Sequence, residues 1–340
     1  MVTPALKQLF VQRGIQLIPI ETGTQILINS LQSNGPVQTV VGGALAPPEM
    51  GQTPSTYRIR RKLTLAANPF LQDHVVGGVA VLPTVCAISW IGRTCEQRYP
   101  GFKFAQCQNF KVLKGIVFNQ TCSEEYVVDI KKVEQHQTDN IVLDVIISSE
   151  TQTGKMRYHY TAQIVLKSQL SDAPLYAFAA PVVSQSPSGI PYYQDGTLFH
   201  GPRLQGVSNV LELHPDKLTM VCKAPMIDER DQGQFPVHTF NPFAADVQFQ
   251  SMVIWARYMY GAASLPLACK FGEQFKRVPF DQTFYVSMTV ESTTESSLTA
   301  SIVTHDEHGH VYNHISGAEV TISKSLNSLF LQNQPLAQVI

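Results

Sequence analysis

The sequence predicts an α+β fold of two similar halves, each a long antiparallel sheet wrapped on one central helix. Short β-type runs dominate residues 57–168, and a comparable series returns over residues 207–323. Each series is interrupted by one strongly apolar helical segment, near 84–98 and near 246–261. A helix that is apolar on most faces must be covered by other elements, so each half is expected to fold around its own helix.

Composition narrows the class of protein. The 340 residues are 44% apolar and 15% charged, which allows a sizeable core in one large unit or two fused ones. A net charge of -1 gives no sign of a phosphate-binding surface, so a nucleic acid is not an expected partner. No apolar run approaches the roughly 20 residues needed to span a bilayer. The six cysteines have no CxxC spacing and no targeting pattern precedes them, so reduced thiols in a cytoplasmic protein are expected.

The first predicted segment covers residues 1–46 and should contain a helix, a short strand, a second helix and the β-type run VQTVVG. Prolines and a glycine then mark a boundary near residues 44–56. The first half, residues 50–181, should carry one helix from about Thr84 to Arg98, ended by Pro100-Gly101. Its expected strands are 57–66, 109–119, 123–134, 140–150 and 155–168.

A Ser/Pro/Gly-rich linker over residues 182–197 leads to the second half, residues 198–330. The second central helix should run from Asp246 to about Gly261. The expected strands of this half are 207–213, 217–223, 274–280, 283–292, 297–305 and 310–323. Asp139-Asn140 and Asp306–Gly309 are the expected hairpin turns.

The first candidate site is HVVGGVAVLP, in which His74 precedes Gly78 by four residues and Pro83 by nine. A neutral imidazole accepts a proton near pH 7. A glycine at a helix entrance allows close approach to backbone N–H groups, which can hold a thioester oxygen as negative charge develops. The alternative is an ordinary loop with an incidental histidine.

The second candidate is NPFAADVQFQ, in which Asp246 and Gln250 share one helix face, so that Gln250 could hold the carboxyl group by a hydrogen bond. The surrounding helix is apolar, and burial raises the pKa of a carboxyl group, as a general acid requires. The alternative is a helix cap. A third stretch, LFHGPRLQG, contains His200, Gly201 and Pro202, and by itself predicts only a loop.

Taken in order, HxxxGxxxxP, GPxxQG and NPxxxDxxxQ resemble the dehydratase domains of polyketide and polyunsaturated fatty acid synthases. The resemblance covers roughly residues 50–325 and implies a double hotdog, the name for two fused sheet-on-helix halves. It includes the Leu265-Pro266-Leu267 motif and the closing strand pair around residues 306–317. It implies that His74 is the catalytic histidine and Asp246 the catalytic aspartate, that Gln250 orients the aspartate, and that Gly78 and Pro83 belong to the first motif.

The sequence departs from the family pattern at three places. The usual YGPxFQG loop has His200 in place of tyrosine and Leu204 in place of phenylalanine, and the usual HPxxxD motif begins with Asn241. His200 could replace the hydrogen bond of the tyrosine to Asp246 or to the substrate hydroxyl, or it could be a plain loop histidine.

The resemblance implies elimination of water from a β-hydroxyacyl thioester carried by an acyl carrier protein. His74 would remove the α-proton, backbone N–H groups near Gly78 would polarise the thioester, and Asp246 would protonate the departing hydroxyl. No cofactor or metal is required. The expected partners are the carrier protein with its phosphopantetheine-linked chain and neighbouring synthase domains, with a homodimer as one option. The alternatives are a non-catalytic pseudo-dehydratase, a product-template-like domain and a thioesterase.

Three further features are open to two interpretations. The basic run Arg58, Arg60, Arg61 and Lys62 could dock an acidic carrier protein, although a solvated strand edge is favoured. Residues 1–43 resemble the end of a ketoreductase domain, and the alternative is a native extension. His305, His308, His310 and His314 are expected to be exposed hairpin histidines rather than a metal site.

Overall fold

The computed structural model describes residues 18–32, 55–119, 125–133, 140–178 and 187–331. The chain divides into two compact units, Met1–Ser55 and Thr56–Ile340. In the first unit, helix α2 (Ile20–Gln32) matches the second of the two helices expected there. The other elements predicted for this segment, including VQTVVG, lie outside the described residues.

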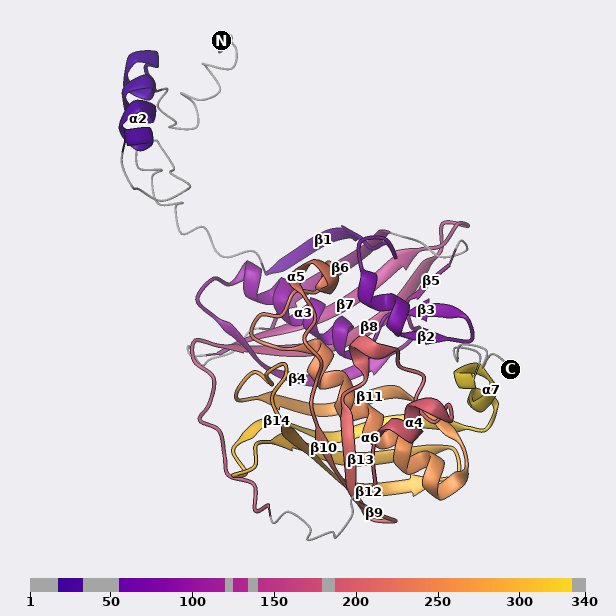
Figure 1. Cartoon of the computed structure of the whole chain (residues 1–340). Coiled ribbons are helices and arrows are strands. Elements are labelled where there is room, and N and C mark those ends of the chain that lie inside the picture. Colours follow the sequence, from indigo (N-terminus) through magenta and orange to yellow (C-terminus); the bar gives the residue numbers. More distant parts are fainter. Residues whose placement is uncertain (1–17, 33–54, 120–124, 134–139, 179–186, 332–340) are drawn as a thin grey trace, which may run out of the picture. The chain divides into compact units, whose positions relative to one another are not determined.

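The larger unit is built on one long antiparallel sheet (Figure 1). Within the described residues this sheet has eleven strands in the order β1-β6-β7-β8-β4-β11-β14-β13-β12-β10-β9. The strands are β1 (Thr56–Lys62), β4 (Lys103–Val112), β6 (Glu125–Lys132), β7 (Asn140–Glu150), β8 (Met156–Lys167), β9 (Val207–His214), β10 (Lys217–Cys222), β11 (Ala263–Gln274), β12 (Phe284–Thr294), β13 (Ser297–His305) and β14 (Val311–Ser323).

The strand order repeats about the pair β4–β11, the seam between the halves. From β4 outward the order is β8, β7, β6 and β1, and from β11 outward it is β14, β13, β12 and β10, with β9 added at the edge. At the seam Cys107 pairs with Gly272 and Phe110 with Cys269. The two predicted halves are therefore confirmed, and they share one continuous sheet.

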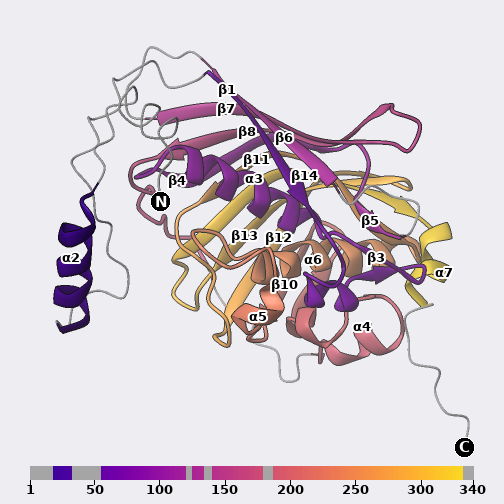
Figure 2. The same ribbon diagram turned by 90° about the horizontal axis from the view of Figure 1, so that it is seen from above.

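The two central helices are α3 (Thr84–Arg98) and α6 (Pro242–Tyr260). They contact each other and lie along the same face of the sheet (Figure 2). Each is the centre of its own apolar core, one containing the buried Trp90 and the other the buried Trp255. This arrangement, a sheet wrapped on one helix in each half, is the predicted double hotdog.

Smaller elements complete the unit. A second sheet of β2 (Val75–Val76), β3 (Val79–Val81) and β5 (Val117–Phe118) lies beside the start of α3. The short helices are η1 (Pro69–Asp73), α4 (Ile190–Gln194), η2 (Pro202–Leu204), α5 (Glu229–Gln232) and α7 (Ser325–Leu331). α4 falls inside the segment predicted to be a linker.

Two strands were predicted in the wrong place. The strand expected at 109–119 is β4, which begins at Lys103 and ends at Val112. The strand expected at 274–280 is β11, which precedes that range and contains Pro266. A proline argues against a strand interior, and here the register shifts between Pro266 and Ala268, the kind of irregularity that accommodates it.

The helix predicted over 84–98 is confirmed, and the turn at Asp306–Gly309 joins β13 to β14 as expected. The other expected turn includes Asp139, which lies outside the described residues. In the described part of the chain, no helix combines the length and apolar character needed to cross a membrane. The five cysteines in that part are all buried and free.

Candidate active site

His74 lies between η1 and β2, at the base of the hairpin that β2 forms with β3. Its Nδ1 lies 2.8 Å from the carbonyl oxygen of Val81, which faces His74 across the base of the same hairpin. A carbonyl only accepts hydrogen bonds, so Nδ1 carries the proton and Nε2 keeps a free lone pair. The hairpin therefore fixes the tautomer of a histidine that can act as a base.

His74 is buried, with 7% of its surface exposed. Burial lowers its pKa to about 4, although the nearby charge of Asp246 acts in the opposite direction. The imidazole is therefore neutral at pH 7. The alternative of an incidental loop histidine does not fit a buried ring with a fixed tautomer.

Asp246 projects from the second turn of α6 and is buried, with 5% of its surface exposed. The helix begins at Pro242, four residues earlier than predicted, because Asn241 caps it. The side chain of Asn241 accepts hydrogen bonds from the backbone N–H groups of Phe243 and Ala244. Asp246 is therefore not the cap, and the departure at Asn241 preserves a capping side chain.

Gln250 holds the carboxylate as predicted. Its Nε2 lies 3.1 Å from Asp246 Oδ2 and also donates to the carbonyl oxygen of Leu204 at 2.9 Å. Its Oε1 accepts a hydrogen bond of 2.7 Å from the hydroxyl of Tyr193 in α4. The residues predicted to be a linker therefore supply part of the support for Asp246. Periodicity gave no signal for a helix as short as α4.

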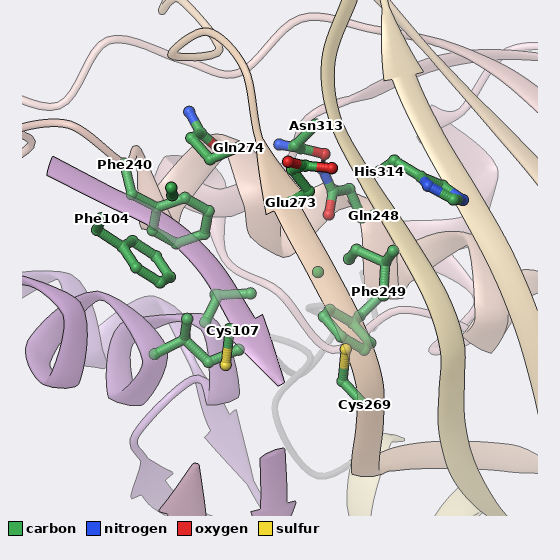
Figure 3. A pocket seen from close by; sticks show the side chains of 15 residues that line it. Phe104, Cys107, Phe240, Gln248, Phe249, Cys269, Glu273, Gln274, Asn313 and His314 are labelled. Atoms are coloured by element: carbon green, nitrogen blue, oxygen red, sulfur yellow. Dashed lines mark hydrogen bonds between the residues drawn. The ribbon is translucent and has the colours of Figure 1, made fainter. Parts of the chain in front are cut away.

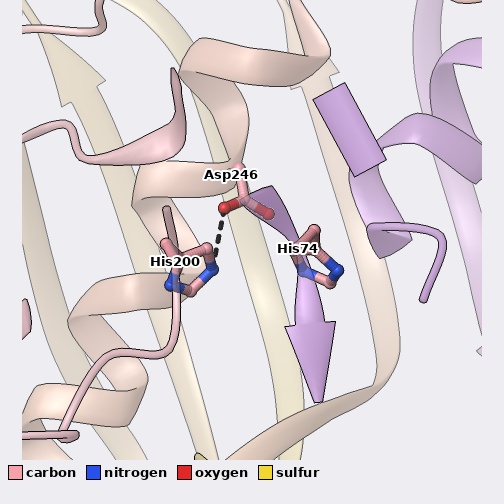
Figure 4. A group of neighbouring side chains, drawn as sticks. All are labelled: His74, His200 and Asp246. Atoms are coloured by element: carbon pink, nitrogen blue, oxygen red, sulfur yellow. Dashed lines mark ion pairs between the residues drawn. The ribbon is translucent and has the colours of Figure 1, made fainter. Parts of the chain in front are cut away.

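His200 contacts the same carboxylate. Its Nε2 lies 3.1 Å from Asp246 Oδ2 (Figure 4). Its ring stacks on Phe199 with centroids 4.1 Å apart, and it meets His74 edge-on at 5.4 Å. Of the interpretations of this departure, the contact with Asp246 is confirmed and the plain loop histidine is wrong.

The loop that carries His200 is anchored to the residue directly before His74. The N–H of Gly201 donates to the carbonyl oxygen of Asp73 at 2.8 Å, and Arg203 pairs with the Asp73 carboxylate at 2.8 Å. A Cβ on Gly201 would lie 2.2 Å from Asp73 Oδ1, so only glycine permits this approach. Pro202 starts η2. Gly201 and Pro202 thus fix the loop and do not line the cavity described below.

The prediction of a raised pKa for Asp246 is wrong in direction. Burial does raise the pKa of the carboxyl group, but the charges of His200 and His74 and the hydrogen bonds from His200 and Gln250 outweigh it. The pKa of Asp246 is lower than its usual value. The prediction considered only the apolar helix, although a contact between His200 and Asp246 was already one of the expectations.

The three side chains meet at one cavity of about 280 Å³. One nitrogen or oxygen atom from each of His74, His200 and Asp246 lies within 4.8 Å of the other two. Most of the wall is apolar, and Val76, Val117, Phe199, Phe249, Val253 and Leu265 contribute to it. The prediction that His74 and Asp246 face each other across one pocket is confirmed.

Gly78 does not lie at a helix entrance. With Gly77 it forms the turn between β2 and β3, where both residues have positive φ angles, 60° for Gly77 and 75° for Gly78. The helix α3 starts only at Thr84, with Pro83 as its N-cap residue. Leu82 and Thr84, at the true entrance of the helix, line the cavity, whereas Gly78 does not.

A second, smaller cavity of about 50 Å³ lies at the seam, between α3, α6 and strands β4 and β11 (Figure 3). Val85, Ile88, Cys107 and Cys269 are among its lining residues. Phe249 of α6 lines both cavities.

The basic run does not form an unpaired cationic patch. Arg58 pairs with Asp129 at 2.7 Å and Arg60 with Glu125 at 2.8 Å, both across the β1–β6 pair. The guanidinium of Arg61 lies over the rings of Trp90 and Phe235. These contacts favour the strand-edge interpretation.

The four histidines near the end of the chain are not uniformly exposed. His308 and His310 are exposed at the hairpin as predicted. His305 is fully buried, with Nε2 3.0 Å from the hydroxyl of Ser287, and His314 is half-buried. The prediction for His305 and His314 is wrong because both lie on strands inside the sheet rather than in the turn.

The fold and this buried trio define a double hotdog domain that brings ionisable groups from both halves to one cavity. Residues 49–145 match the polyketide synthase dehydratase domain, and residues 184–329 match the polyketide synthase dehydratase N-terminal domain. The chain therefore belongs to the dehydratase-domain family of polyketide synthases.

Among curated proteins, a polyunsaturated fatty acid synthase polypeptide from Thraustochytrium sp. is 30% identical over 291 residues, which is 85% of this chain and 10% of that protein. A highly reducing polyketide synthase from Fusarium sp. is 22% identical over 65% of this chain and 9% of its own length. The chain thus spans about a tenth of the length of these relatives.

Among solved structures, the dehydratase domain of the CurF module of curacin polyketide synthase has a TM-score of 0.62 at 14% identity, covering 81% of this chain and 95% of that one. A trans-AT polyketide synthase dehydratase domain from Brevibacillus brevis has a TM-score of 0.61 at 20% identity, covering 79% of this chain and 94% of its own. At these identities the likeness concerns the fold.

Proposed function

We propose that this domain removes water from a β-hydroxyacyl thioester to give an enoyl thioester. One observation carries the proposal. His74 of the first half is a neutral histidine with a fixed tautomer, and Asp246 of the second half is a hydrogen-bonded carboxyl group. Both face the same buried cavity, and a ring nitrogen of His74 lies no more than 4.8 Å from a carboxylate oxygen of Asp246. Such a pair can take a proton from one carbon of a bound chain and give a proton to the oxygen on the next.

In this mechanism His74 is the base. Its free Nε2 accepts the α-proton, while Nδ1 remains bonded to the Val81 carbonyl and stabilises the imidazolium that forms. Since its pKa is about 4, a large fraction of the enzyme holds the base in its reactive neutral form at pH 7.

Asp246 delivers the proton to the leaving hydroxyl, and His200 shares that proton with it. A carboxyl group whose pKa is lowered is rarely protonated at pH 7 when it acts alone. The 3.1 Å contact between His200 Nε2 and Asp246 Oδ2 provides a place where the proton is held. Before the step the pair holds one proton as a His200 imidazolium beside the Asp246 carboxylate. When the C–O bond breaks, this proton passes through Asp246 to the hydroxyl, water departs, and His200 is left neutral. Exchange with solvent then removes the α-proton from His74 and restores one proton to the pair.

The thioester carbonyl is polarised at the start of α3. The first N–H groups of a helix have no partner within that helix and can hold developing negative charge. Leu82 and Thr84 place this end of α3 in the cavity wall. We therefore assign to the α3 entrance the role that the spacing suggested for Gly78, with Pro83 setting the entry of the chain into the helix.

The substrate is proposed to reach the site on an acyl carrier protein within a larger synthase, with its acyl tail along the apolar wall toward Phe249. The product would be a trans-2-enoyl thioester, or a cis-alkene if the site also isomerises. Neighbouring synthase domains, a homodimer and a cytoplasmic location belong to the same proposal. The resemblance of residues 1–43 to a ketoreductase remnant stays a prediction.

The test is incubation of the full chain with a 3-hydroxyacyl thioester on a carrier protein or a pantetheine mimic. Mass spectrometry should show the loss of one water while the thioester remains intact. Release of free acid would identify a thioesterase instead. Binding without reaction would identify a pseudo-dehydratase. The product-template alternative predicts no dehydration but cyclisation of a polyketide chain.

A further inference from the structure

The trio in the cavity has the composition of a transition-metal site. Two imidazole rings and one carboxylate are common ligands of Zn²⁺, Co²⁺ and Fe²⁺ in proteins. All three groups are buried, with exposed fractions of 7% for His74, 6% for His200 and 5% for Asp246. We propose that His74, His200 and Asp246 bind one divalent transition-metal ion, with Zn²⁺ as the best-suited ion, and that the bound ion blocks dehydration.

The separation of the groups suits an ion after a small movement. One ligand atom from each residue lies within 4.8 Å of the others. Two ligands at about 2.1 Å from a tetrahedral zinc ion lie about 3.4 Å apart. Binding therefore requires the widest pair to close by up to about 1.4 Å, a distance within reach of side-chain rotation. The adjoining cavity of about 280 Å³ leaves room for a water or thioester oxygen as a fourth ligand.

The groups around the trio also match those around metal ligands. A ligating histidine usually donates a hydrogen bond from its second ring N–H to a backbone carbonyl or carboxylate, as His74 Nδ1–H does to the Val81 carbonyl. A ligating carboxylate is usually held by a hydrogen bond, as Asp246 is by Gln250. In this state the lone pair of His74 Nε2 is available to a metal ion.

His200 adds a second observation. Its Nε2 lies 3.1 Å from Asp246 Oδ2, close to the separation of two ligands on one tetrahedral zinc ion. Its Nδ1, on the other side of the ring, has no hydrogen-bond partner among the described residues, so no neighbour there opposes a ring that leaves Nε2 free for an ion. The family loop usually has tyrosine here, and a neutral phenol is a weak ligand for zinc near pH 7. The substitution at position 200 therefore completes the trio.

The ion would block dehydration because it binds the same lone pairs that the reaction uses, and this part of the inference rests on the proposed function. Zinc at the trio would occupy the nitrogen of His74 that removes the α-proton and the Asp246 carboxylate that delivers a proton. Mg²⁺ and Ca²⁺ prefer oxygen ligands, so they should neither bind nor inhibit.

The binding test uses the purified full chain, titrated with Zn²⁺ by calorimetry and with Co²⁺ by visible absorption. One ion per chain is expected, with a Co²⁺ spectrum typical of nitrogen and oxygen ligands. His200→Tyr and His74→Gln should each weaken binding by more than about tenfold. His308→Ala/His310→Ala, which removes the exposed histidine pair, is the matched control and should retain full binding. Circular dichroism must show that each variant is folded, and Asp246→Asn replaces any variant that is not.

Two results would overturn the site: no one-to-one binding of Zn²⁺ or Co²⁺ at micromolar concentrations, or full binding in both His200→Tyr and His74→Gln. The blocking effect is measured separately, as inhibition of dehydration by Zn²⁺ and recovery with a chelator. Full activity with the ion bound would overturn that part. Metal binding by a chain that never dehydrates its substrate would instead refute the proposed function and leave the site in place.

Discussion

The two halves share a fold but place their reactive groups differently. In the first half, His74 stands on a short hairpin before the helix, and α3 begins after Pro83 without a side-chain cap. In the second half, Asp246 stands on the helix itself, and Asn241 caps α6. Counted from the cap residue, Ile88 in α3 occupies the place of Asp246 in α6. Its apolar side chain lines the second cavity.

This difference shows how a duplicated fold can form one asymmetric site. In the proposed mechanism the base needs a free lone pair, and the hairpin leaves one free because it engages only one nitrogen of His74. A proton donor needs partners that hold its proton, and the helix supplies them through Gln250 while the loop supplies His200. Each half therefore contributes a group that the other lacks.

The largest effect is expected from variants that remove the proton-transfer group of one half, and these variants test whether catalysis needs both halves. His74→Gln and Asp246→Asn should each reduce kcat by about 10²–10⁴-fold, because each removes one proton-transfer group. Enoyl-thioester formation followed by mass spectrometry measures the loss. The double variant should be little worse than either single one, since the two groups act as a unit. If the loss of kcat in the double variant equals the product of the two single losses, the two residues do not act in one step.

The next largest effect is expected from a variant that disturbs the contact between Gly201 of the second half and Asp73 of the first. Gly201→Ala places a methyl group 2.2 Å from Asp73 Oδ1, so the His200 loop must move. A displacement of about 1 Å can reduce kcat by about a hundredfold. Gly272→Ala, where the nearest atom lies at an ordinary 3.8 Å, is the control and should keep its rate. Equal rates for both variants would mean that the loop position is unimportant.

The third prediction concerns pH and the buried base. The pKa of His74 is about 4 in the folded chain and near 6.5 when unfolded, so the unfolded chain binds the extra proton between these values. Stability should therefore fall as the pH drops from about 6.5 to 4, by up to about 3 kcal/mol from this residue. Urea unfolding of the wild type and His74→Gln across this range measures the difference.

If the stability difference between these two chains is independent of pH, His74 is not buried in its neutral form. The same shift predicts that kcat/KM retains its value on the acid side of pH 7 and declines only as the pH nears 4.

The smallest effect compares the two helix entrances. Asn241→Ala removes the cap of α6 and the hydrogen bond from Nδ2 to the Val278 carbonyl, and should destabilise the chain by about 1–2 kcal/mol. Pro83→Ala at the α3 entrance removes no side-chain cap, and the loss of the proline ring should destabilise the chain by only about 0.4–1 kcal/mol. Thermal unfolding of both variants measures the contrast, and equal losses would show that the entrances are held alike.

Local signals predicted much of the fold. The ends of α3 were correct because Pro83 and Pro100-Gly101 flank an apolar run. Strand β11 was expected too late in the chain, at 274–280, and a proline such as Pro266 makes a strand harder to find from its pattern. The register shift with β14 shows how the strand tolerates that proline. The start of α6 was missed because Asn241-Pro242 is a cap followed by a first helical proline, not the end of a loop.

The residues of the site could be predicted from the sequence, but their chemistry was harder to predict. The order of the motifs identified His74, Asp246, Gln250 and His200, and these four residues lie together in the structure. The pKa of Asp246 was predicted in the wrong direction, because the prediction considered burial alone and left out the charge and hydrogen bond of His200. Gly78 was assigned to a helix entrance because its hairpin is only two pairs long, too short for a period-two pattern.

The seam between β4 and β11 has one more consequence. The halves are held together by backbone pairing and by the contact of α3 with α6, in addition to the peptide link between β8 and β9. A chain cut in that link before α4 would yield one fragment with His74 and another with His200 and Asp246. We expect neither fragment to turn over substrate alone, and the mixture to regain activity as the severed pieces reassociate along the seam.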